Sequence, residues 1–265
     1  MERLIRQFTS ASFGVCDFAA VSDRLIDCRA KARLPQNAQS VICFAFPYKV
    51  RHPAPENISR YAAVPDYHDI CGRTLEKIAA ALSGNYPENH FSAFCDNSPI
   101  PEVAACAAAG LGVIGTNGLL ITENYGSFVF LGEIVTDLPL YPHGVTARCD
   151  DCGLCRSACP VGLDKSRCLS ALTQQKKPLT RAQEIQIAES GCVWGCDICQ
   201  EVCPRNKNAA LTDIGEFIAG YRDRYVPGED ISGRAFAWRG EKVIARNALL
   251  AEKVSDVITA DAPEE

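Results

Sequence analysis

Most cysteines of this 265-residue chain lie in one short segment. Nine of the fifteen fall between Cys149 and Cys203. The first run there has the form Cys-x2-Cys-x2-Cys-x3-Cys-Pro and ends at Pro160. This is the spacing of bacterial ferredoxins, in which three thiolates on a tight loop reach three irons of one [4Fe–4S] cluster and the fourth cysteine serves a second cluster. The spacing therefore predicts iron–sulfur clusters and one-electron chemistry.

A second run, Cys-x2-Cys-x3-Cys-Pro, begins at Cys196 and lacks the first cysteine of the motif. Cys168 and Cys192 are the candidates for the missing ligand. Cys192 lies four residues before Cys196, which is not the ferredoxin interval, so Cys168 is favoured. Structural zinc is the alternative for Cys-x2-Cys pairs, although zinc sites do not usually pair two runs that end in Cys-Pro. We assign one cluster to Cys149, Cys152, Cys155 and Cys203, and the other to Cys159, Cys168, Cys196 and Cys199.

The remaining cysteines are expected to be small buried side chains rather than ligands or disulfides. Nothing in their spacing points to chemistry, and free cysteine packs as a small hydrophobic residue. Cys95 is a partial exception because it precedes Asp96, but packing is favoured there too. The others are Cys16, Cys28, Cys43, Cys71 and Cys106.

Composition narrows the class of protein. The chain is 47% hydrophobic and 22% charged, which is the balance of a folded, soluble protein. No apolar run reaches the roughly 18 residues needed to span a bilayer. The N-terminus lacks the apolar region of a signal peptide, so we expect the protein in the cytoplasm. The net charge of −5 has the wrong sign for a generic nucleic-acid binder.

Basic residues nevertheless gather around the cysteine-rich segment. One interpretation is an ordinary solvated face, and the other is a docking surface for an acidic partner or a polyanion. The residues are Arg156, Lys165, Arg167, Lys176, Lys177, Arg181, Arg205 and Lys207.

The elements around the cysteines indicate an α+β protein with three parts. Residues 1–140 form an α/β domain, residues 141–210 a double-cluster ferredoxin-like domain, and residues 211–265 C-terminal helices with an acidic tail. Apolar spacing in the first part predicts helices over 66–82 and 101–109, and strands over 40–46, 91–95 and 127–136, the last with a bulge at Gly132. Further helices are expected over 166–174, 180–189, 211–225 and 241–253, with a frayed end from Thr259.

The sequence resembles the epoxyqueuosine reductases, which are related to the reductive dehalogenases. The likeness runs from about Leu34 to Leu250. The motifs that carry it are Asp66-Tyr67-His68, Asp96-Asn97-Ser98-Pro99, AGLGVIGTN from Ala109 to Asn117, YGSFVFLGE from Tyr125 to Glu133, Arg167-Cys168-Leu169-Ser170, GCDICQEVCP from Gly195 to Pro204, and Arg246-Asn247-Ala248. The resemblance also favours Cys168 over Cys192, because the family uses that cysteine as a ligand.

The resemblance implies cofactors and an activity. The first domain would bind cobalamin, in a nitroreductase-like or reductive-dehalogenase-like fold, and the clusters would supply it with electrons from a low-potential donor of the flavodoxin or ferredoxin type. The reaction would be the reductive deoxygenation of epoxyqueuosine to queuosine in tRNA. Cobalamin contacts are expected at Ser59, Arg60, Asp96, Asn97, Gly112, Gly115, Asn117, Tyr125, Gly126 and Ser127.

Asp96 matches the aspartate that donates a proton in this family. A carboxyl facing an apolar corrin would have a raised pKa and keep its proton. The plainer interpretation is an aspartate that forms the turn Asp-Asn-Ser-Pro. The glycines before Thr116 have the form GxGxxG, but they follow a helix rather than a strand, which argues against a dinucleotide site. They would instead allow the backbone to approach a flat corrin closely.

Departures from the family leave the substrate open. Thr116 stands where the family has a lysine, and Val103 where a basic residue is usual. The glycine before Asp66-Tyr67-His68 is missing, and the loop from Cys159 to Cys168 is short. We also expect this to be a short form without the C-terminal helical-repeat domain of some family members. Two alternatives therefore remain: the same machinery acting on a small molecule, and an electron-transfer or corrinoid-handling protein without turnover.

Overall fold

The computed structural model describes residues 1–142, 144 and 148–260, with side chains of the last helix described up to Glu252. Two compact units are formed, and each combines separate stretches of the chain. Unit 1 contains Met1–Lys49, Tyr67–Gly153 and Cys203–Ile214. Unit 2 contains Val50–Asp66, Leu154–Val202 and Gly215–Glu265. Cys203 thus returns to the unit that contains the start of the first cysteine run.

Unit 1 is built on a four-stranded antiparallel sheet in the order β1-β2-β6-β3. The eight residues of β2 are all buried, as expected for a central strand rich in β-branched and aromatic residues. The strands are β1 Ser12–Asp17, β2 Ser40–Pro47, β3 Phe91–Phe94 and β6 Val129–Thr136, with the small hairpin β4 Val113–Ile114 and β5 Leu120–Ile121 beside them. The predicted strands over 40–46, 91–95 and 127–136 are confirmed.

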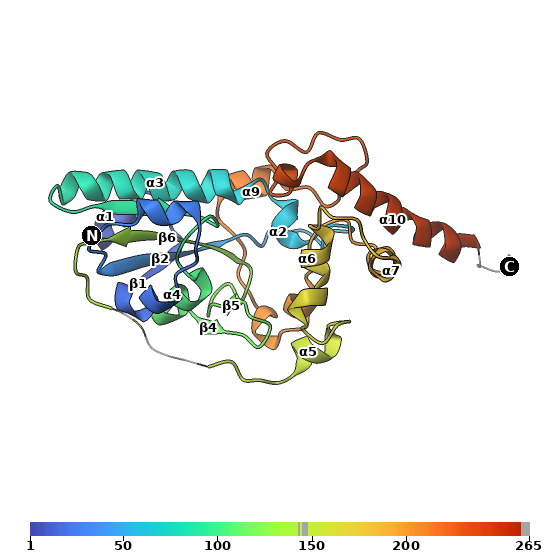
Figure 1. Ribbon diagram of the computed structural model, residues 1–265, viewed down its shortest axis with the longest axis horizontal. Helices are drawn as coiled ribbons and strands as arrows, with labels where there is room; N and C mark the ends of the chain where they lie inside the picture. Colours follow the sequence, from blue (N-terminus) through green and yellow to red (C-terminus); the bar gives the residue numbers. More distant parts are fainter. Residues whose placement is uncertain (143, 145–147, 261–265) are drawn as a thin grey trace. The chain divides into compact units, whose positions relative to one another are not determined.

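Helices cover both faces of this sheet. Figure 1 shows α3 (Tyr67–Asn85) on one face and α4 (Glu102–Ala108) on the other. Alternation along β6 places Gly132 toward α3 and its neighbour Glu133 toward α4, because successive residues of a strand point to opposite faces. The short elements of unit 1 are α1 Glu2–Ile5 and the 3-10 turns Phe18–Ala20, Ser22–Arg24, Arg29–Arg33 and Pro204–Asn206.

The bulge predicted at Gly132 is wrong. The ladder between β2 and β6 is continuous there, with Phe44 opposite Gly132 and Cys43 opposite Glu133. A Cβ atom at Gly132 would lie 2.6 Å from Cδ1 of Leu75. The glycine is therefore explained by the close approach of α3 to the sheet.

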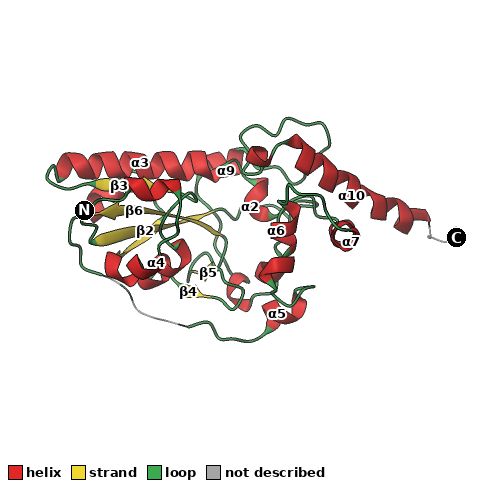
Figure 2. Cartoon of the chain, viewed as in Figure 1, coloured by secondary structure: helices red, strands yellow, loops and turns green. Residues whose placement is uncertain are grey.

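Unit 2 consists of several short helices and the long helix α10, joined by loops (Figure 2). Helix α7 begins with a capping box, in which the Thr180 hydroxyl accepts the Gln183 N–H and the Gln183 side chain accepts the Thr180 N–H. The helices are α2 Arg60–Ala63, α5 Leu154–Ala158, α6 Leu169–Thr173, α7 Arg181–Ser190, α8 Ile198–Glu201, α9 Gly215–Ala219 and α10 Glu241–Ala260, with 3-10 turns at Lys165–Arg167 and Ala237–Arg239. The predicted helices over 166–174, 180–189 and 241–253 are confirmed in their main parts.

The helix predicted over 211–225 is mostly wrong, since only α9 forms. Backbone groups after Gly220 bond to distant residues instead of continuing the helix. The Arg222 N–H donates to the Ala63 carbonyl at 2.8 Å, and the Tyr225 N–H donates to Oδ1 of Asn57 at 2.8 Å. The frayed end predicted from Thr259 is helical up to Ala260, and its remainder lies outside the described residues.

Candidate functional site

The cysteines assigned to the second cluster all belong to unit 2. Burial raises the pKa of the Cys196 thiol, the Ile198 N–H lowers it, and Asp197, Cys168 and Cys159 raise it further. Cys159 and Cys168 therefore lie close enough to Cys196 to affect the pKa of its thiol. The fourth cysteine of this set, Cys199, is the second residue of α8, and α8 packs against α5.

Cys192 has a different environment. Its thiol donates to the carbonyl oxygens of Trp194 at 3.4 Å and Gly195 at 3.2 Å. Burial raises its pKa to about 12, and Cys196 is the only cysteine among the groups that act on it. Cys192 is thus a partly buried thiol bonded to its own loop.

Two cysteines assigned to the first cluster lie beside one guanidinium in unit 1. Arg205 forms an ion pair with Asp150, at 2.8 Å between Nη2 and Oδ1, and the charges of Cys149 and Cys203 also raise its pKa. Backbone N–H groups of Asp151 and Thr116 lower the pKa of Cys149. These hydrogen bonds favour the thiolate form of Cys149.

The other two cysteines of that set continue the same run. Cys152 is exposed at the end of a stretch of unit 1, and Cys155 lies in α5 of unit 2. Within the described part of the chain, no three or more side chains of His, Cys, Asp or Glu are grouped to hold a single metal ion.

Asp96 occupies a tight turn directly after β3. Its φ of 60° lies in the left-handed region, which is uncommon for residues other than glycine but is tolerated by Asp and Asn. Two short backbone bonds close the turn, from the Asn97 N–H to the Cys95 carbonyl and from the Ser98 N–H to the Asp96 carbonyl, both at 2.8 Å. The Asp96 side chain is 58% exposed, and its Oδ2 lies 3.2 Å from Nε2 of His68 at the start of α3.

The protonation of Asp96 differs from the sequence expectation. The bond with His68 lowers the pKa of the Asp96 carboxyl, burial raises it, and the charge of His68 and the hydroxyl of Tyr67 lower it again. We expected a raised pKa. The physical reason for the difference is the imidazole partner, which stabilises the carboxylate.

Two further carboxyls lie next to the Asp96 turn. Burial raises the pKa of Glu102 to about 7, and its Oε1 accepts the Asp96 N–H at 3.2 Å. Glu133 on β6 is fully buried, and burial raises its pKa well above the usual value for glutamate. The Ser98 hydroxyl donates to Glu133.

The glycines expected to contact a corrin are explained by packing within unit 1. A Cβ atom at Gly112 would lie 2.3 Å from the Ile121 carbonyl oxygen, and one at Gly115 would lie 2.5 Å from Oδ1 of Asn117. Gly126 has a φ of +56°, and a Cβ atom there would lie 2.0 Å from Oδ1 of Asn206. Asn117 itself accepts the Leu119 N–H at 3.3 Å within the β4–β5 turn.

Ser127 links the loop before β6 to the segment after Cys203 by hydrogen bonds. Its N–H donates to Oδ1 of Asn206 at 2.8 Å, and its hydroxyl accepts from Nδ2 of the same residue at 2.8 Å. Both residues are buried. Tyr125 lies in the same loop, where its N–H donates to the Thr122 hydroxyl at 3.1 Å. Asn97 is exposed beside Asp96 and lines a small pocket of about 150 Å³ together with His68.

Ser59 and Arg60 lie at the start of α2 in unit 2. The Ser59 side chain is buried, and its hydroxyl has no hydrogen-bond partner within the described residues. The Arg60 N–H donates to Oδ2 of Asp197 at 2.6 Å, and its guanidinium bonds to Glu201. Burial raises the pKa of Asp197 to about 6.

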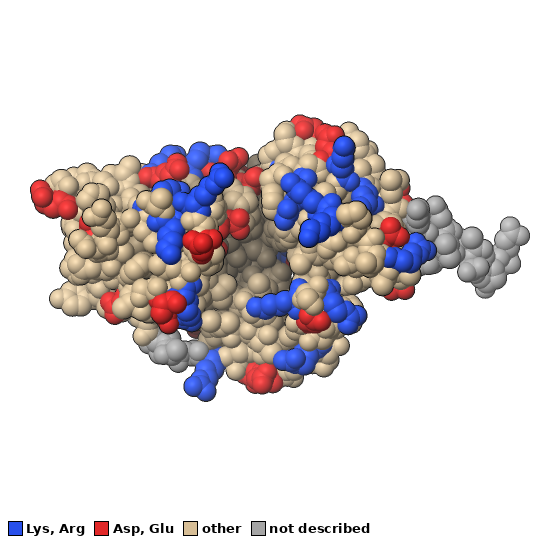
Figure 3. Space-filling model, viewed as in Figure 1, with Lys and Arg blue, Asp and Glu red and all other residues tan. Residues whose placement is uncertain are grey.

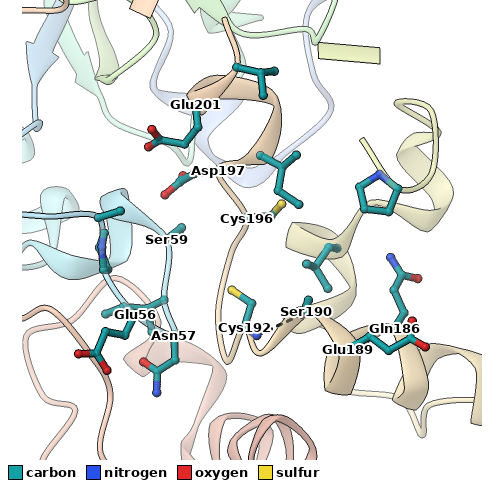
Figure 4. A pocket seen from close by; sticks show the side chains of 17 residues that line it. Glu56, Asn57, Ser59, Gln186, Glu189, Ser190, Cys192, Cys196, Asp197 and Glu201 are labelled. Atoms are coloured by element: carbon teal, nitrogen blue, oxygen red, sulfur yellow. Dashed lines mark hydrogen bonds between the residues drawn. The ribbon is translucent and has the colours of Figure 1, made fainter. Parts of the chain in front are cut away.

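A pocket of about 640 Å³ is lined both by Ser59 and by the cysteine loop (Figure 4). Cys192 and Cys196 reach it from the loop between α7 and α8, and Asp197 lies beside Cys196. Asn247 of α10 fixes the start of this loop, because its Nδ2 donates to the carbonyls of Val193 at 2.9 Å and Thr173 at 2.7 Å.

The eight basic residues noted around the cysteines are all exposed. Two of them are paired with acids, Arg205 with Asp150 and Arg181 with Glu184. On the face seen in Figure 3, acidic side chains are interspersed with basic ones. Among the described residues no helix is long and apolar enough to cross a bilayer.

Four residues around Asp96 were not predicted as site residues: Tyr67, His68, Glu102 and Glu133. The first two belong to the Asp-Tyr-His motif, whose match to the family was the available signal. Glu102 lies only six residues after Asp96, and Glu133 ends the matched YGSFVFLGE motif, so both had a signal in the sequence. That the two lie on either side of the Asp96 turn depends on the packing of α4 against β6.

Comparisons with known proteins identify the family of the chain. The family model described as "Epoxyqueuosine reductase QueG, DUF1730" matches residues 29–97, which end just after Asp96. Curated epoxyqueuosine reductases from Synechocystis and Staphylococcus aureus are 36% and 31% identical over 197 and 259 residues, which cover 68% and 67% of those relatives and 68% and 87% of this chain. The chain belongs to the epoxyqueuosine reductase family.

Coverage of the relatives varies within the family. An epoxyqueuosine reductase from Gloeobacter violaceus is 40% identical over 185 residues, 64% of this chain, but this region spans only 57% of that relative. A crystal structure of a selenomethionine-labelled epoxyqueuosine reductase matches with a TM-score of 0.81 and 25% identity, over 94% of this chain and 80% of that one. An epoxyqueuosine reductase solved with a tRNA-Tyr epoxyqueuosine-modified stem loop shares the fold, with a TM-score of 0.81, 24% identity and the same coverage. The mixed α/β fold is thus that of the family.

Proposed function

We propose that this chain is a cobalamin- and iron–sulfur-dependent reductase that removes the epoxide oxygen of epoxyqueuosine in tRNA. The observation that carries the proposal is Asp96, held after β3 with its carboxylate 3.2 Å from His68 in a member of this family. An electron carrier needs no such proton-holding pair, so the pair favours an enzyme.

The cysteines suit thiolate-ligated clusters. Cys159 and Cys168 lie within electrostatic reach of Cys196, and Cys149 and Cys203 share the field of Arg205. We assign one cluster to Cys149, Cys152, Cys155 and Cys203. The other falls to Cys159, Cys168, Cys196 and Cys199. Such clusters would supply single electrons at low potential.

The residues expected at cobalamin fit that cofactor in part. The buried Ser59 hydroxyl without a partner is the kind of group that a polar cofactor atom would satisfy. Gly112, Gly115 and Gly126 instead pack against their own unit, so their presence does not by itself indicate a corrin. When bound, cobalamin would supply the reducing metal centre.

Asp96 and His68 would hold and transfer the proton that the reaction needs. Because the pKa of Asp96 is lowered, its carboxyl is ionised near neutral pH. A proton that Asp96 donates must therefore arrive from a neighbour. His68 Nε2, at 3.2 Å, is placed to hold that proton.

Anaerobic reconstitution with iron, sulfide and cobalamin tests the proposal. We expect visible spectra with both iron–sulfur and corrin bands, followed by conversion of epoxyqueuosine to queuosine in tRNA. Iron–sulfur absorption without corrin bands would instead identify an electron carrier. Corrin binding without tRNA turnover would favour a small-molecule substrate, the alternative raised by Thr116 and Val103.

A further inference from the structure

A network of acidic groups lies beneath the Asp96 turn in unit 1. Glu102 is the first residue of α4, and Glu133 lies in the middle of β6. Glu133 is fully buried, and its Oε2 has no hydrogen-bond partner within the described residues. The proposed proton transfer uses neither glutamate. Two carboxyls in so apolar a place require an explanation, because a buried acid destabilises the fold unless it is bonded or protonated.

The two glutamates bond to opposite ends of the same turn. Glu102 accepts the N–H of Asp96 at 3.2 Å. Glu133 accepts the hydroxyl of Ser98, and the Ser98 hydroxyl in turn accepts the N–H of Ile100 at 3.0 Å. The turn is therefore held at Asp96 through α4 and at Ser98 through β6.

The two carboxyls also act on each other. Burial raises the pKa of both carboxyls, and the charge of Glu102 raises the pKa of Glu133 further. Glu133 is therefore the carboxyl of the two that more readily keeps a proton. An ionised Glu102 is the stronger acceptor for the Asp96 amide.

Backbone conformation makes such an anchor necessary. Asp96 has a φ of 60°, which is unfavourable for a residue with a Cβ atom unless its surroundings hold it there. The two bonds that close the turn join only its own residues. An acceptor from another element is needed to fix the direction of the Asp96 side chain toward His68.

We propose that Glu102 is a positioning residue that holds the Asp96 turn through the backbone N–H of Asp96, while Glu133 holds the other end of the turn through the Ser98 hydroxyl. The inference rests on the proposed function only for the role of Asp96. The anchor itself is a property of the folded chain and can be measured without cofactors or substrate.

Hydrogen exchange of the Asp96 amide in the purified 265-residue protein tests the anchor. In Glu102→Ala the amide loses its acceptor, so its protection factor should fall about tenfold or more relative to wild type. In Glu102→Gln a side-chain oxygen can still accept the N–H, so most of the protection should remain. Glu88→Gln, at an exposed glutamate after α3, is the matched control and should leave the amide unchanged.

The pH dependence separates anchoring from a general loss of structure. The pKa of Glu102 is about 7, so wild-type protection of the Asp96 amide should weaken as the pH falls from 8 to 6. Glu102→Gln cannot titrate and should show no such change. Other groups facing Glu102 remain in both proteins: Asp96 and Cys95 from the turn, Glu133 from β6, Cys106 from α4, and Tyr67 and His68 from α3.

Several results would overturn the proposal. They are full protection of the Asp96 amide in Glu102→Ala, equal loss of protection across β6 and α4, and the same pH dependence in Glu102→Gln as in wild type. If Glu102→Ala does not fold, the comparison of Glu102→Gln with wild type still decides. None of these results depends on whether the protein reduces epoxyqueuosine.

Discussion

Asp96 is the residue on which the proposed chemistry depends most. Asn adopts the same left-handed turn, so Asp96→Asn should keep the fold, both clusters and cobalamin. Turnover should fall by about 10²- to 10⁴-fold, the usual effect of losing a general acid. Steady-state rates of the reconstituted variant give the measurement. Activity within about twofold of wild type would reduce Asp96 to a turn former.

A second assay of Asp96→Asn distinguishes electron transfer from proton transfer. Reduction of bound cobalamin by the clusters needs no acid, so this step should survive Asp96→Asn. If it fails as well, Asp96 shapes the cofactor site and does not deliver the proton.

Cys168 and Cys192 provide the sharpest comparison among the cysteines. Two clusters correspond to about eight irons and eight sulfides per chain. Cys168→Ala should lose or damage the cluster that includes Cys196, whereas Cys192→Ala should leave both clusters intact. Iron and sulfide analysis after reconstitution distinguishes the two. Loss of a cluster in Cys192→Ala but not in Cys168→Ala would reverse the assignment.

At the scale of elements, Gly132 controls how closely α3 packs on the sheet. Gly132→Ala would place a Cβ atom 2.6 Å from Leu75, and such overpacking costs about 1–3 kcal/mol. Gly84→Ala, in α3 itself, is the control, because no atom lies within 4 Å of its Cβ position. It should leave stability unchanged or raise it by up to about 1 kcal/mol. Thermal melts of both variants provide the comparison, and equal melting temperatures would contradict the packing argument.

The carboxyls between α4 and β6 predict how stability depends on pH. The pKa of Glu102 is raised above its usual value of 4.5 to about 7. The folded state therefore binds this proton more tightly than the unfolded state. The stabilising effect is present in full below about pH 4.5 and is lost as the pH rises through about 7. Glu102→Gln should thus lose less stability than wild type between pH 5 and 8, as measured by melting temperature. An equal or larger loss would show that Glu102 titrates normally.

Sequence patterns were informative where the signal is local. The cysteine intervals, the apolar run of β2 and the spacing of α3 each depend on neighbouring residues, and the structure contains the corresponding elements. The pairing of Ser127 with Asn206, 79 residues later, leaves no local trace. The bond between His68 and Asp96 is likewise long-range, and it reversed the expected direction of the Asp96 pKa.

Some errors arose because tertiary contacts overrode local preference. The apolar spacing of residues 211–225 suits a helix, yet residues 57 and 63 accept the N–H groups that would continue it. Strand β1 was missed, since its sequence SFGVCD lacks the alternation of a half-buried strand and contains a glycine. Its burial comes from pairing with β2.

At the scale of the whole molecule, the proposed reaction requires both clusters and cobalamin in one chain. Cobalamin should bind the reconstituted protein, and equilibrium dialysis measures its retention. Ser59 offers a specific check, because Ser59→Ala removes a buried hydroxyl that has no partner in the described residues. Weaker retention in Ser59→Ala than in wild type would place this hydroxyl at the cofactor. Equal retention would remove Ser59 from the cofactor contacts.

The most direct test is the fate of the substrate oxygen. The reconstituted chain, given a chemical reductant and epoxyqueuosine-containing tRNA without oxygen, should yield queuosine, which mass spectrometry of the digested nucleosides detects as the loss of one oxygen atom. Omission of cobalamin should abolish this product. Unchanged epoxyqueuosine after incubation with a protein that carries both clusters and cobalamin would contradict the proposed activity.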